Sequence, residues 1–322
     1  MATATIPQAA RLSQRASLLR RAFSGDSLAQ LVVFLAATAI LALTAVLVWE
    51  LWSHSGPSRA KFGWDFLRTS NWDPVAGEFG ALPFIYGTVV TSLVALLIAI
   101  PFGVGAAIFL AELAPPKLSD AMTFLIELLA AVPSVIFGLI GIFVLVPMLT
   151  KIVPGLKDAL GFLPVFAGPF YGVSLLSAGV VLSVMVAPFI ISVSREVLLA
   201  VPRDLREAAL ALGATRWEST WDIVVPFARR GIMGSVFLAL ARALGETMAV
   251  TMVVGNTPKI AASLLAPGYS IAAVIANEFA EATSDIHIST LIELGLVLFG
   301  VTIVLNAAAR LLILATGGKV SQ

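Results

Sequence analysis

The sequence is poor in the residues on which soluble enzymes and nucleic-acid-binding proteins depend. It has no cysteine and only two histidines, His54 and His287, which argues against disulfides, thiolate chemistry and a histidine-based metal cage. Charged residues make up only 12% of the chain, about half the share usual in soluble domains. The net charge of +1 supplies no basic field for nucleic acid, and no G-x-x-x-x-G-K-[ST] motif is present to hold ATP phosphates.

Hydrophobic residues, by contrast, dominate the chain. They account for 59% of the 322 residues, and the mean hydropathy is +1.00. A helix needs about 20 apolar residues to cross a bilayer. We therefore predict an all-α integral membrane protein with six spans, at 28–49, 84–111, 121–149, 173–194, 231–254 and 288–314. The predicted organisation is a tail (1–27), a first anchor span (28–49), an outer loop (50–83), a core (84–314) and a second tail (315–322).

Basic residues indicate how the chain is oriented. The four arginines before the first span also fit the start of a cleaved signal peptide. The apolar run after them has 22 residues, longer than the ~7–15 of a cleaved signal, and no A-x-A site follows, which favours a retained span. With the N-terminus in the cytoplasm, 13 Lys and Arg residues lie inside and 6 outside. Because basic loops remain in the cytoplasm, we predict that both termini are there.

One predicted inner loop, 201–230, is much longer than the others. Pro202 is typical of a helix start, and Asp204 with Glu207 three residues later resembles a capping box. The following run of Ala and Leu favours helix, and Gly213 is expected to stop it. The first half of the loop is therefore predicted to be a short helix on the cytoplasmic side.

A second short helix is predicted after that glycine, at 217–224. Thr215 is placed to cap it and Pro226 to end it. Trp217 and Trp221 are four residues apart, so they share one face of the helix. An amphipathic pair of helices resting on lipid headgroups would explain these tryptophans and the nearby arginines.

The spacing within this loop carries more information than its amphipathicity. It follows the pattern EAA-x3-G-x9-I-x-L-P, with valine at 225 in place of leucine, and the matching residues are Glu207, Ala208, Ala209, Gly213, Ile223 and Pro226. The pattern resembles the EAA loop of importer-type ABC transporter permeases. This resemblance implies a type I ABC importer permease fold, in which the loop is the coupling helix that docks on a separate cytoplasmic ATPase.

Three further strings narrow the resemblance. They are ELLAAVPSVIFGLIG, RALGETMAV, and the segment running from APGY to NEFAEA. Together they resemble the phosphate-specific ABC permeases, and among these the PstC subunits more than their PstA partners, over residues 84–314. The resemblance implies import of inorganic phosphate across the bacterial cytoplasmic membrane, with no cofactor in this chain. It also implies a PstA-like second permease, two PstB-like ATPases that use ATP, and a PstS-like periplasmic phosphate-binding protein, and no nucleic acid.

A charged pair in the fifth predicted span is the candidate substrate site. At 1.5 Å per residue, Arg242 lies about 16 Å from the start of that span, close to the middle of the bilayer. Inserting a lone arginine at that depth costs at least ~2.5–3.5 kcal/mol. Glu246 follows four residues later, on the same face of a continuous helix. The guanidinium fork of Arg242 suits phosphate, and Glu246 would neutralise it when no phosphate is bound. Ser134 and Thr247 are weaker candidates along the path. A purely structural ion pair, to another helix or to the partner permease, is the alternative.

Other kinds of membrane protein fit the composition less well. An ion-coupled transporter or channel is expected to have inverted repeats or a filter string, and neither is visible in the sequence. An intramembrane enzyme needs a nucleophile or an acid–base pair, and cysteine is absent. An ABC permease for another small oxyanion or solute stays open, because the EAA pattern does not specify the substrate.

Overall fold

The computed structural model describes residues 25–316 of the chain. The chain divides into two units, Met1–His54 and Ser55–Gln322. The described part of the first unit is one helix, α2 (Gly25–His54), which contains the predicted first span and extends beyond it by more than a turn. The predicted tails, 1–27 and 315–322, lie largely outside the described residues.

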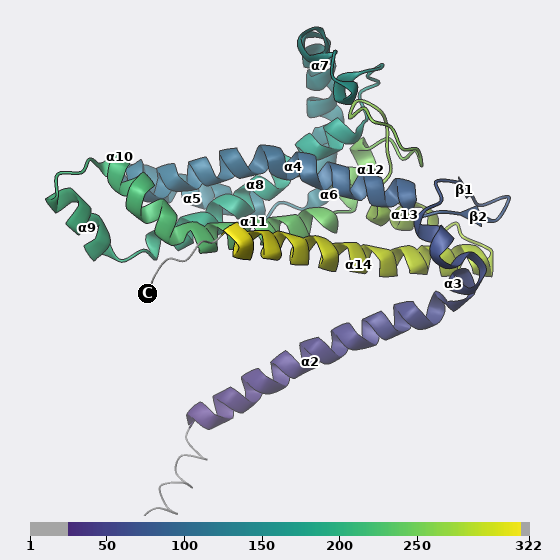
Figure 1. Cartoon of the computed structure of the whole chain (residues 1–322), viewed down its shortest axis with the longest axis horizontal. Coiled ribbons are helices and arrows are strands. Elements are labelled where there is room, and N and C mark those ends of the chain that lie inside the picture. Colours follow the sequence, from purple (N-terminus) through teal and green to yellow (C-terminus); the bar gives the residue numbers. More distant parts are fainter. Residues whose placement is uncertain (1–24, 317–322) are drawn as a thin grey trace, which may run out of the picture. The chain divides into compact units, whose positions relative to one another are not determined.

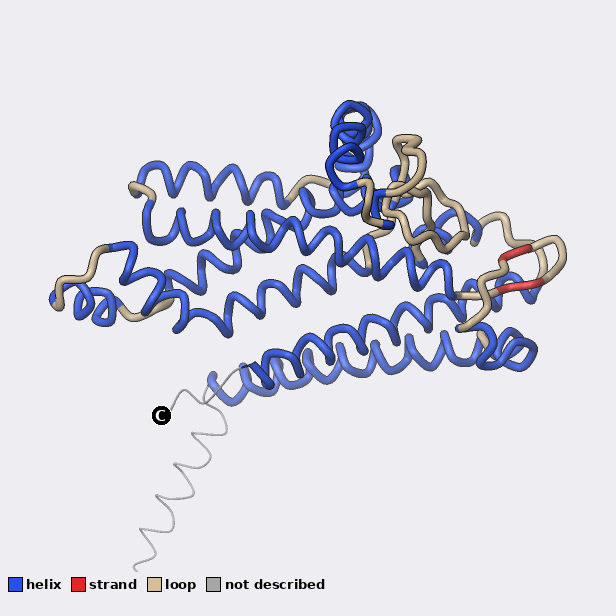
Figure 2. The backbone as a smooth tube through the Cα atoms, turned by 45° about the horizontal axis from the view of Figure 1, so that its top comes forward, coloured by secondary structure: helices blue, strands red, loops and turns tan. Residues whose placement is uncertain are grey.

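The second unit is built from helices, and among its described residues the only strands form one short hairpin (Figures 1 and 2). The hairpin pairs β1 (Trp72–Asp73) with β2 (Glu78–Phe79) in antiparallel fashion. The long helices are α4 (Leu82–Ile108), α8 (Leu175–Leu199), α11 (Val225–Leu244) and α14 (Asp285–Thr316). The shorter ones are α3 (Gly56–Phe62), α5 (Pro116–Ala130), α6 (Ser134–Ile140), α7 (Val146–Leu160), α9 (Arg203–Ala211), α10 (Arg216–Ser219), α12 (Met248–Val253) and α13 (Ile271–Glu278).

Short irregular turns complete the helical framework. Three π-helical turns, Phe109–Leu113, Gly141–Leu145 and Thr220–Val224, interrupt or end longer helices. Two 3₁₀ turns, Gly63–Leu67 and Pro164–Phe166, lie in the connections. π-helical turns mark places where a helix is locally adjusted, and they are frequent at functional sites.

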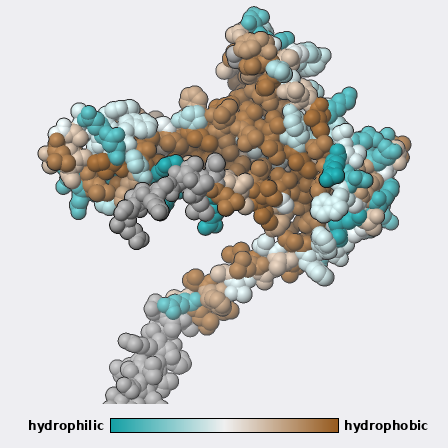
Figure 3. Space-filling model, in the orientation of Figure 1, coloured by the Kyte–Doolittle hydropathy of each residue, from teal (hydrophilic) through white to brown (hydrophobic). Residues whose placement is uncertain are grey.

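Six helical runs among the described residues are long and apolar enough to cross a membrane, as the sequence predicts. They are Ala29–His54, Leu82–Leu113, Ser134–Ala159, Leu175–Leu199, Arg216–Leu244 and Asp285–Leu311. Figure 3 shows hydrophobic residues over the middle of the second unit and hydrophilic ones at its two ends, around α9 and around the hairpin. This distribution is the one expected of a protein whose middle lies in lipid.

The boundaries predicted for the third span, 121–149, are wrong. The chain leaves the helix between α5 and α6, at 131–133. Pro133 has no N–H to continue a helix, and its ring disfavours helical backbone at the residue before it. The segment 121–130 is therefore part of a separate helix, and the candidate span begins at Ser134 and runs through the π-helical turn into α7.

The predicted fifth span, 231–254, is wrong at both ends. The helix begins as early as Arg216, because α10, a π-helical turn and α11 form one run. Pro226 does not end a helix as predicted; it lies in the first turn of α11, directly after the π-helical turn, which accommodates its missing N–H. At the other end α11 stops at Leu244, and residues 245–247 separate it from α12.

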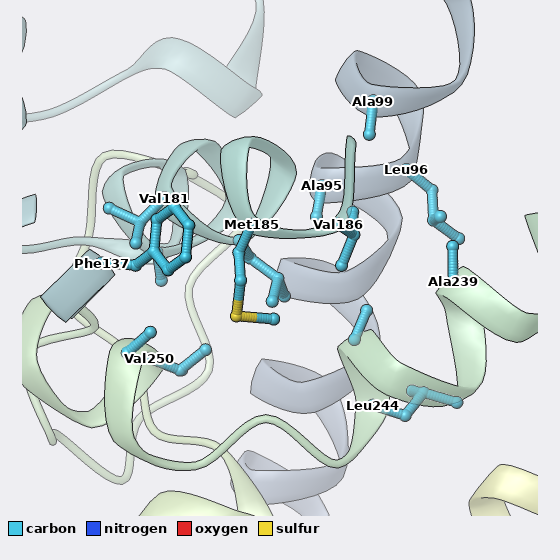
Figure 4. Close-up of a cluster of buried hydrophobic side chains, with 14 of the residues drawn as sticks. Ala95, Leu96, Ala99, Phe137, Val181, Met185, Val186, Ala239, Leu244 and Val250 are labelled. Carbon is cyan, nitrogen blue, oxygen red and sulfur yellow. The ribbon is translucent and has the colours of Figure 1, made fainter. Parts of the chain in front are cut away.

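The main hydrophobic core lies between α4, α8 and α11, with α6 and α12 against it. Figure 4 shows side chains of these helices converging, among them Ala95, Leu96, Met185, Val186 and Ala239. A Cβ on Gly179 of α8 would lie 2.4 Å from a methyl group of Val94 on α4. Glycine at this position therefore lets the two helices approach closely, as small residues do in membrane bundles.

Candidate functional site

The two short helices of the 201–230 segment meet at a turn that requires glycine. Gly213, two residues after α9 ends, has a φ of +90°, a left-handed conformation that side chains disfavour. Its N–H donates to the carbonyl of Leu210 at 3.0 Å, and the N–H of Ala214 donates to the carbonyl of Ala209 at 3.1 Å. These two bonds form a Schellman motif. The predicted stop at Gly213 is confirmed.

One of the two caps predicted in this segment is confirmed. Thr215 caps α10: its Oγ1 accepts from the N–H of Glu218 at 3.3 Å, and the Glu218 carboxylate accepts from the N–H of Thr215 at 2.7 Å. The cap predicted for α9 is wrong. Pro202 occupies the N-cap, and neither Asp204 nor Glu207 makes a capping hydrogen bond there. Pro202 itself fixes the backbone entering the helix, so the turn forms without a side-chain cap.

Most residues of the EAA pattern face away from the protein. Glu207, Ala208, Gly213 and Pro226 are exposed, Ile223 is half-buried and Ala209 is buried. Apolar side chains beside them are exposed too, with Leu212 at 90% and Trp217 at 56%. The rings of Trp217 and Trp221 pack edge to face, 5.5 Å apart, which confirms that they share a face. The surface at the α9 and α10 end (Figure 1) thus carries exposed apolar side chains among polar ones, as a docking site does.

Arg206 is a residue of this segment that sequence reasoning did not single out. Its Nη2 lies 2.8 Å from Oε1 of Glu112, and its Nε donates to the other carboxylate oxygen at 3.2 Å. The same guanidinium donates to the carbonyls of Leu198 and Val201 at the end of α8. Both charged side chains are largely buried, at 19% and 10% exposed. A sequence signal existed in the glutamate at the end of an apolar span, but nothing in the sequence paired it with Arg206.

Arg242 and Glu246, the candidate substrate residues, are not joined as predicted. Arg242 lies in the last turn of α11 with its side chain exposed, whereas Glu246 lies in the break after that helix. Because the helix ends at Leu244, the four-residue spacing no longer places the two side chains on one face. No ion pair joins them among the described residues. Glu246 Oε1 instead accepts a hydrogen bond from the N–H of Ala249 at 3.2 Å, in the first turn of α12.

Ser134 and Thr247, the weaker candidates, each stand where a helix begins. Ser134 is the first residue of α6, and Thr247 precedes α12. The two helices pack in parallel, since Gly138 lies against Ala249 and Gly141 lies one turn farther along against Val253. Extending both helices back by a turn puts Ser134 level with the break at 245–247. The structure thus brings Ser134, Glu246 and Thr247 to one level, next to the end of the helix that carries Arg242.

Within the described residues the site has no metal-binding character. No group of three or more His, Asp or Glu side chains there is arranged to hold a metal ion. The chemistry available at the helix break consists of one guanidinium, one carboxylate and hydroxyl groups. Guanidinium and hydroxyl groups are hydrogen-bond donors of the kind that bind anions.

Comparison with known proteins places the chain in a family. Residues 99–316 match the family described as "Binding-protein-dependent transport system inner membrane component". The chain belongs to this permease family. Membership makes it a multi-pass inner-membrane component of a transporter and not an enzyme, with the ATPase of such a system in a separate subunit.

Individual relatives place the chain within the family. The "Phosphate transport system permease protein PstC" of Mesorhizobium japonicum is 44% identical over 307 residues, 94% of each chain. The protein of the same description in Xylella fastidiosa is 48% identical over 285 residues, 87% of each. A "Probable phosphate transport system permease protein PstC" of Methanocaldococcus jannaschii is 37% identical over 257 residues, 78% of this chain and 81% of its own. The chain is thus a member of the PstC permeases.

A solved structure of an ABC transporter is also similar, at a greater distance. One chain in inward-facing conformations of the MetNI methionine ABC transporter aligns with a TM-score of 0.47 and 18% sequence identity. The alignment covers 70% of this chain and 93% of that chain.

Proposed function

We propose that this chain is the permease through which an ATP-driven importer carries inorganic phosphate across the cytoplasmic membrane. Two observations support the substrate. The relatives described as phosphate transport permeases are 44–48% identical over most of the chain. In addition, Arg242 ends a membrane-spanning helix with an exposed guanidinium that has no hydrogen bond or ion pair among the described residues. This exposed arginine is the observation on which the proposal depends most.

Arg242 is proposed to be the phosphate-binding residue on the path. Phosphate carries one or two negative charges at neutral pH and loses hydration when it enters a bilayer. A guanidinium offers two parallel N–H donors that match two phosphate oxygens and so replaces part of that hydration. An arginine engaged by a neighbouring carboxylate would be less able to do so. Glu246 accepts a bond from the N–H of Ala249 and forms no ion pair with Arg242 among the described residues, which supports an Arg242 that is available to substrate.

The residues at the helix break are proposed to complete the path. Ser134 and Thr247, whose hydroxyl donates to the carbonyl of Gly245 at 3.4 Å, carry hydroxyl groups at the level of the break, and Glu246 keeps the local charge near neutral when phosphate is absent. Non-helical backbone at membrane depth is tolerated where protein or a water-filled cavity surrounds it. The position of residues 245–247 between α11 and α12 therefore supports a path that passes this point. A structural ion pair between Arg242 and the partner permease is the competing account.

The opposite end of α11 is proposed to couple transport to ATP hydrolysis. Glu207, Ala208, Ala209, Gly213, Ile223 and Pro226 form the EAA segment, whose exposed apolar face would dock in a cytoplasmic ATPase. This assignment places α9, and with it both chain termini, in the cytoplasm. The partners are then a PstA-like permease, two PstB-like ATPases and a PstS-like binding protein. ATP-driven closure of the ATPases would switch the permease pair between inward and outward access as rigid bodies.

Uptake by cells tests the proposed substrate. The chain is expressed with its partner subunits in cells that lack their own phosphate transporters, and uptake of labelled phosphate and labelled sulfate is measured. The proposal expects phosphate uptake that depends on this chain and is not reduced by excess sulfate. Equal uptake of sulfate would indicate an ABC permease whose substrate is not specifically phosphate. The absence of ATP-dependent uptake would favour an ion-coupled transporter or channel.

A further inference from the structure

One ion pair joins the end of the α4 run to α9 and lies beside the end of α8. Glu112 lies in the π-helical turn that ends the α4 run, and Arg206 lies on α9, the helix of the EAA segment. The guanidinium binds both carboxylate oxygens, at 2.8 and 3.2 Å. It also donates to the carbonyl of Leu198 at 2.7 Å and to that of Val201. The Leu198 carbonyl belongs to the last turn of α8, where helical carbonyls lack partners within the helix, and Val201 lies two residues beyond the end of that helix.

Besides Arg206, two residues of α9 are at least partly buried. Ala209 is the one buried residue among its nine, and Leu205 is partly buried against the cluster that contains Ile108 and Leu198. The chain itself links α9 to α8 through residues 200–202 and to α11 through α10. Neither link reaches α4. Within residues 25–316, the bond from Arg206 to Glu112 is the direct polar connection between the EAA helix and the turn that ends the α4 run.

The turn that carries Glu112 is itself fixed to its neighbours. Ser119 of α5 donates to the carbonyl of Leu110 in the same turn at 2.7 Å, and Arg195 of α8 donates to Ser119 Oγ at 3.0 Å. A displacement of Glu112 therefore moves the inner ends of α4, α5 and α8 together. Because α4 and α8 pack closely around Gly179, such a displacement is transmitted along their length.

We propose that Arg206 and Glu112 form the joint through which α9 moves α4 and α8 when the ATPase closes. Both are positioning residues, since neither lies at the proposed phosphate path. The inference rests on the proposed function, because it takes α9 as the helix on which the ATPase acts. Burial favours a rigid joint: an ion pair shielded from water is screened little, and removing one partner leaves an uncompensated charge.

The test separates transport from ATP hydrolysis in one preparation. The complete transporter is reconstituted in liposomes as wild type, Arg206→Gln, Glu112→Gln and the double variant, and phosphate uptake and ATP hydrolysis are both measured. We expect the phosphate carried per ATP hydrolysed to fall about tenfold in each single variant, within the range typical of coupling between sites. The double variant should be no worse than the poorer single one, because both substitutions remove the same interaction.

Two further variants separate coupling from folding. Arg203→Gln is the matched control, since Arg203 is an exposed arginine of the same helix and should keep the wild-type ratio. Arg206→Lys keeps the positive charge but loses the two-pronged guanidinium. This variant should assemble normally and carry an amount of phosphate per ATP between those of wild type and Arg206→Gln. The proposal is overturned if phosphate uptake and ATP hydrolysis fall in proportion, so that the phosphate carried per ATP is unchanged. It is also overturned if Arg206→Lys carries as much phosphate per ATP as wild type, or if the double variant shows the product of the two single-variant reductions. A wild-type complex that couples hydrolysis to another solute would refute phosphate as substrate, and the ratio would then be measured with that solute.

Discussion

The carboxylate of Glu246 accepts a hydrogen bond from the backbone N–H of Ala249 at 3.2 Å and does not pair with Arg242, four residues before it. The carboxylate thus satisfies one of the free N–H groups at the start of α12. It also leaves the guanidinium of Arg242 without an anion from its own helix. The break between α11 and α12 therefore carries a carboxylate that bonds to the start of the second helix and does not pair with the guanidinium.

The hydrogen bond to Ala249 gives a prediction for Glu246. Glu246→Gln keeps an oxygen that accepts the Ala249 N–H, whereas Glu246→Ala removes it, and losing a side-chain acceptor at a helix start costs about 0.5–2 kcal/mol. The thermal unfolding midpoint of the purified permease pair should therefore be lower for the Ala variant than for the Gln variant. Glu246→Gln should lie close to wild type. Equal midpoints for the Ala variant and wild type would mean that the bond contributes nothing to stability.

The turn at Gly213 predicts a local effect on ATPase docking. Gly213→Ala forces a side chain into a backbone with a φ of +90°, at a cost of about 1–3 kcal/mol. The turn between α9 and α10 should distort, and less ATPase should co-purify with the permease. Gly105→Ala is the control, because a Cβ there meets open space and the glycine lies in helix α4. Full ATPase recovery with Gly213→Ala would show that the turn geometry is dispensable.

Close packing of α4 and α8 predicts a stability difference between two glycines. Gly179→Leu places a side chain against Val94, where even a Cβ would lie only 2.4 Å away, and overpacking of this kind costs about 1–3 kcal/mol or more. Gly105→Leu adds the same side chain where there is space. We expect poor recovery of the folded permease for the first variant and normal recovery for the second, measured by gel filtration in detergent. Similar recovery of both would contradict close packing at Gly179.

The sequence predicted the number and approximate place of the membrane spans, because length and hydropathy determine them. It did not predict where helices break inside an apolar stretch. Val132-Pro133 and residues 245–247 end helices through local backbone preferences, which apolar composition hides. The pairing of Arg242 with Glu246 was inferred from spacing along a continuous helix, and it failed for the same reason. Arg206 and Glu112 are 94 residues apart in sequence, and spacing alone cannot detect such a contact.

The absence of cysteine allows the proposed orientation to be tested directly. Val75→Cys lies in the hairpin turn and Leu212→Cys beside the EAA turn, at native positions that are 99% and 90% exposed. A membrane-impermeant maleimide should label the first variant in intact spheroplasts and the second only after the membrane is opened. Labelling in the reverse order would place α9 outside and refute ATPase docking on it.

Arg242 is the residue on which the account depends most, and ATP hydrolysis in the reconstituted transporter tests it directly. The rate of hydrolysis and the uptake of labelled anion are both measured with the loaded binding protein in the presence of phosphate or sulfate. The variants are wild type, Arg242→Gln and Arg230→Gln, which replaces an exposed arginine at the other end of the same helix. The account predicts that phosphate alone stimulates hydrolysis and drives uptake in wild type and Arg230→Gln. Uptake should fall at least tenfold in Arg242→Gln, as expected for the loss of charge-assisted bidentate bonds to phosphate. Normal uptake by a fully assembled Arg242→Gln transporter would contradict the account.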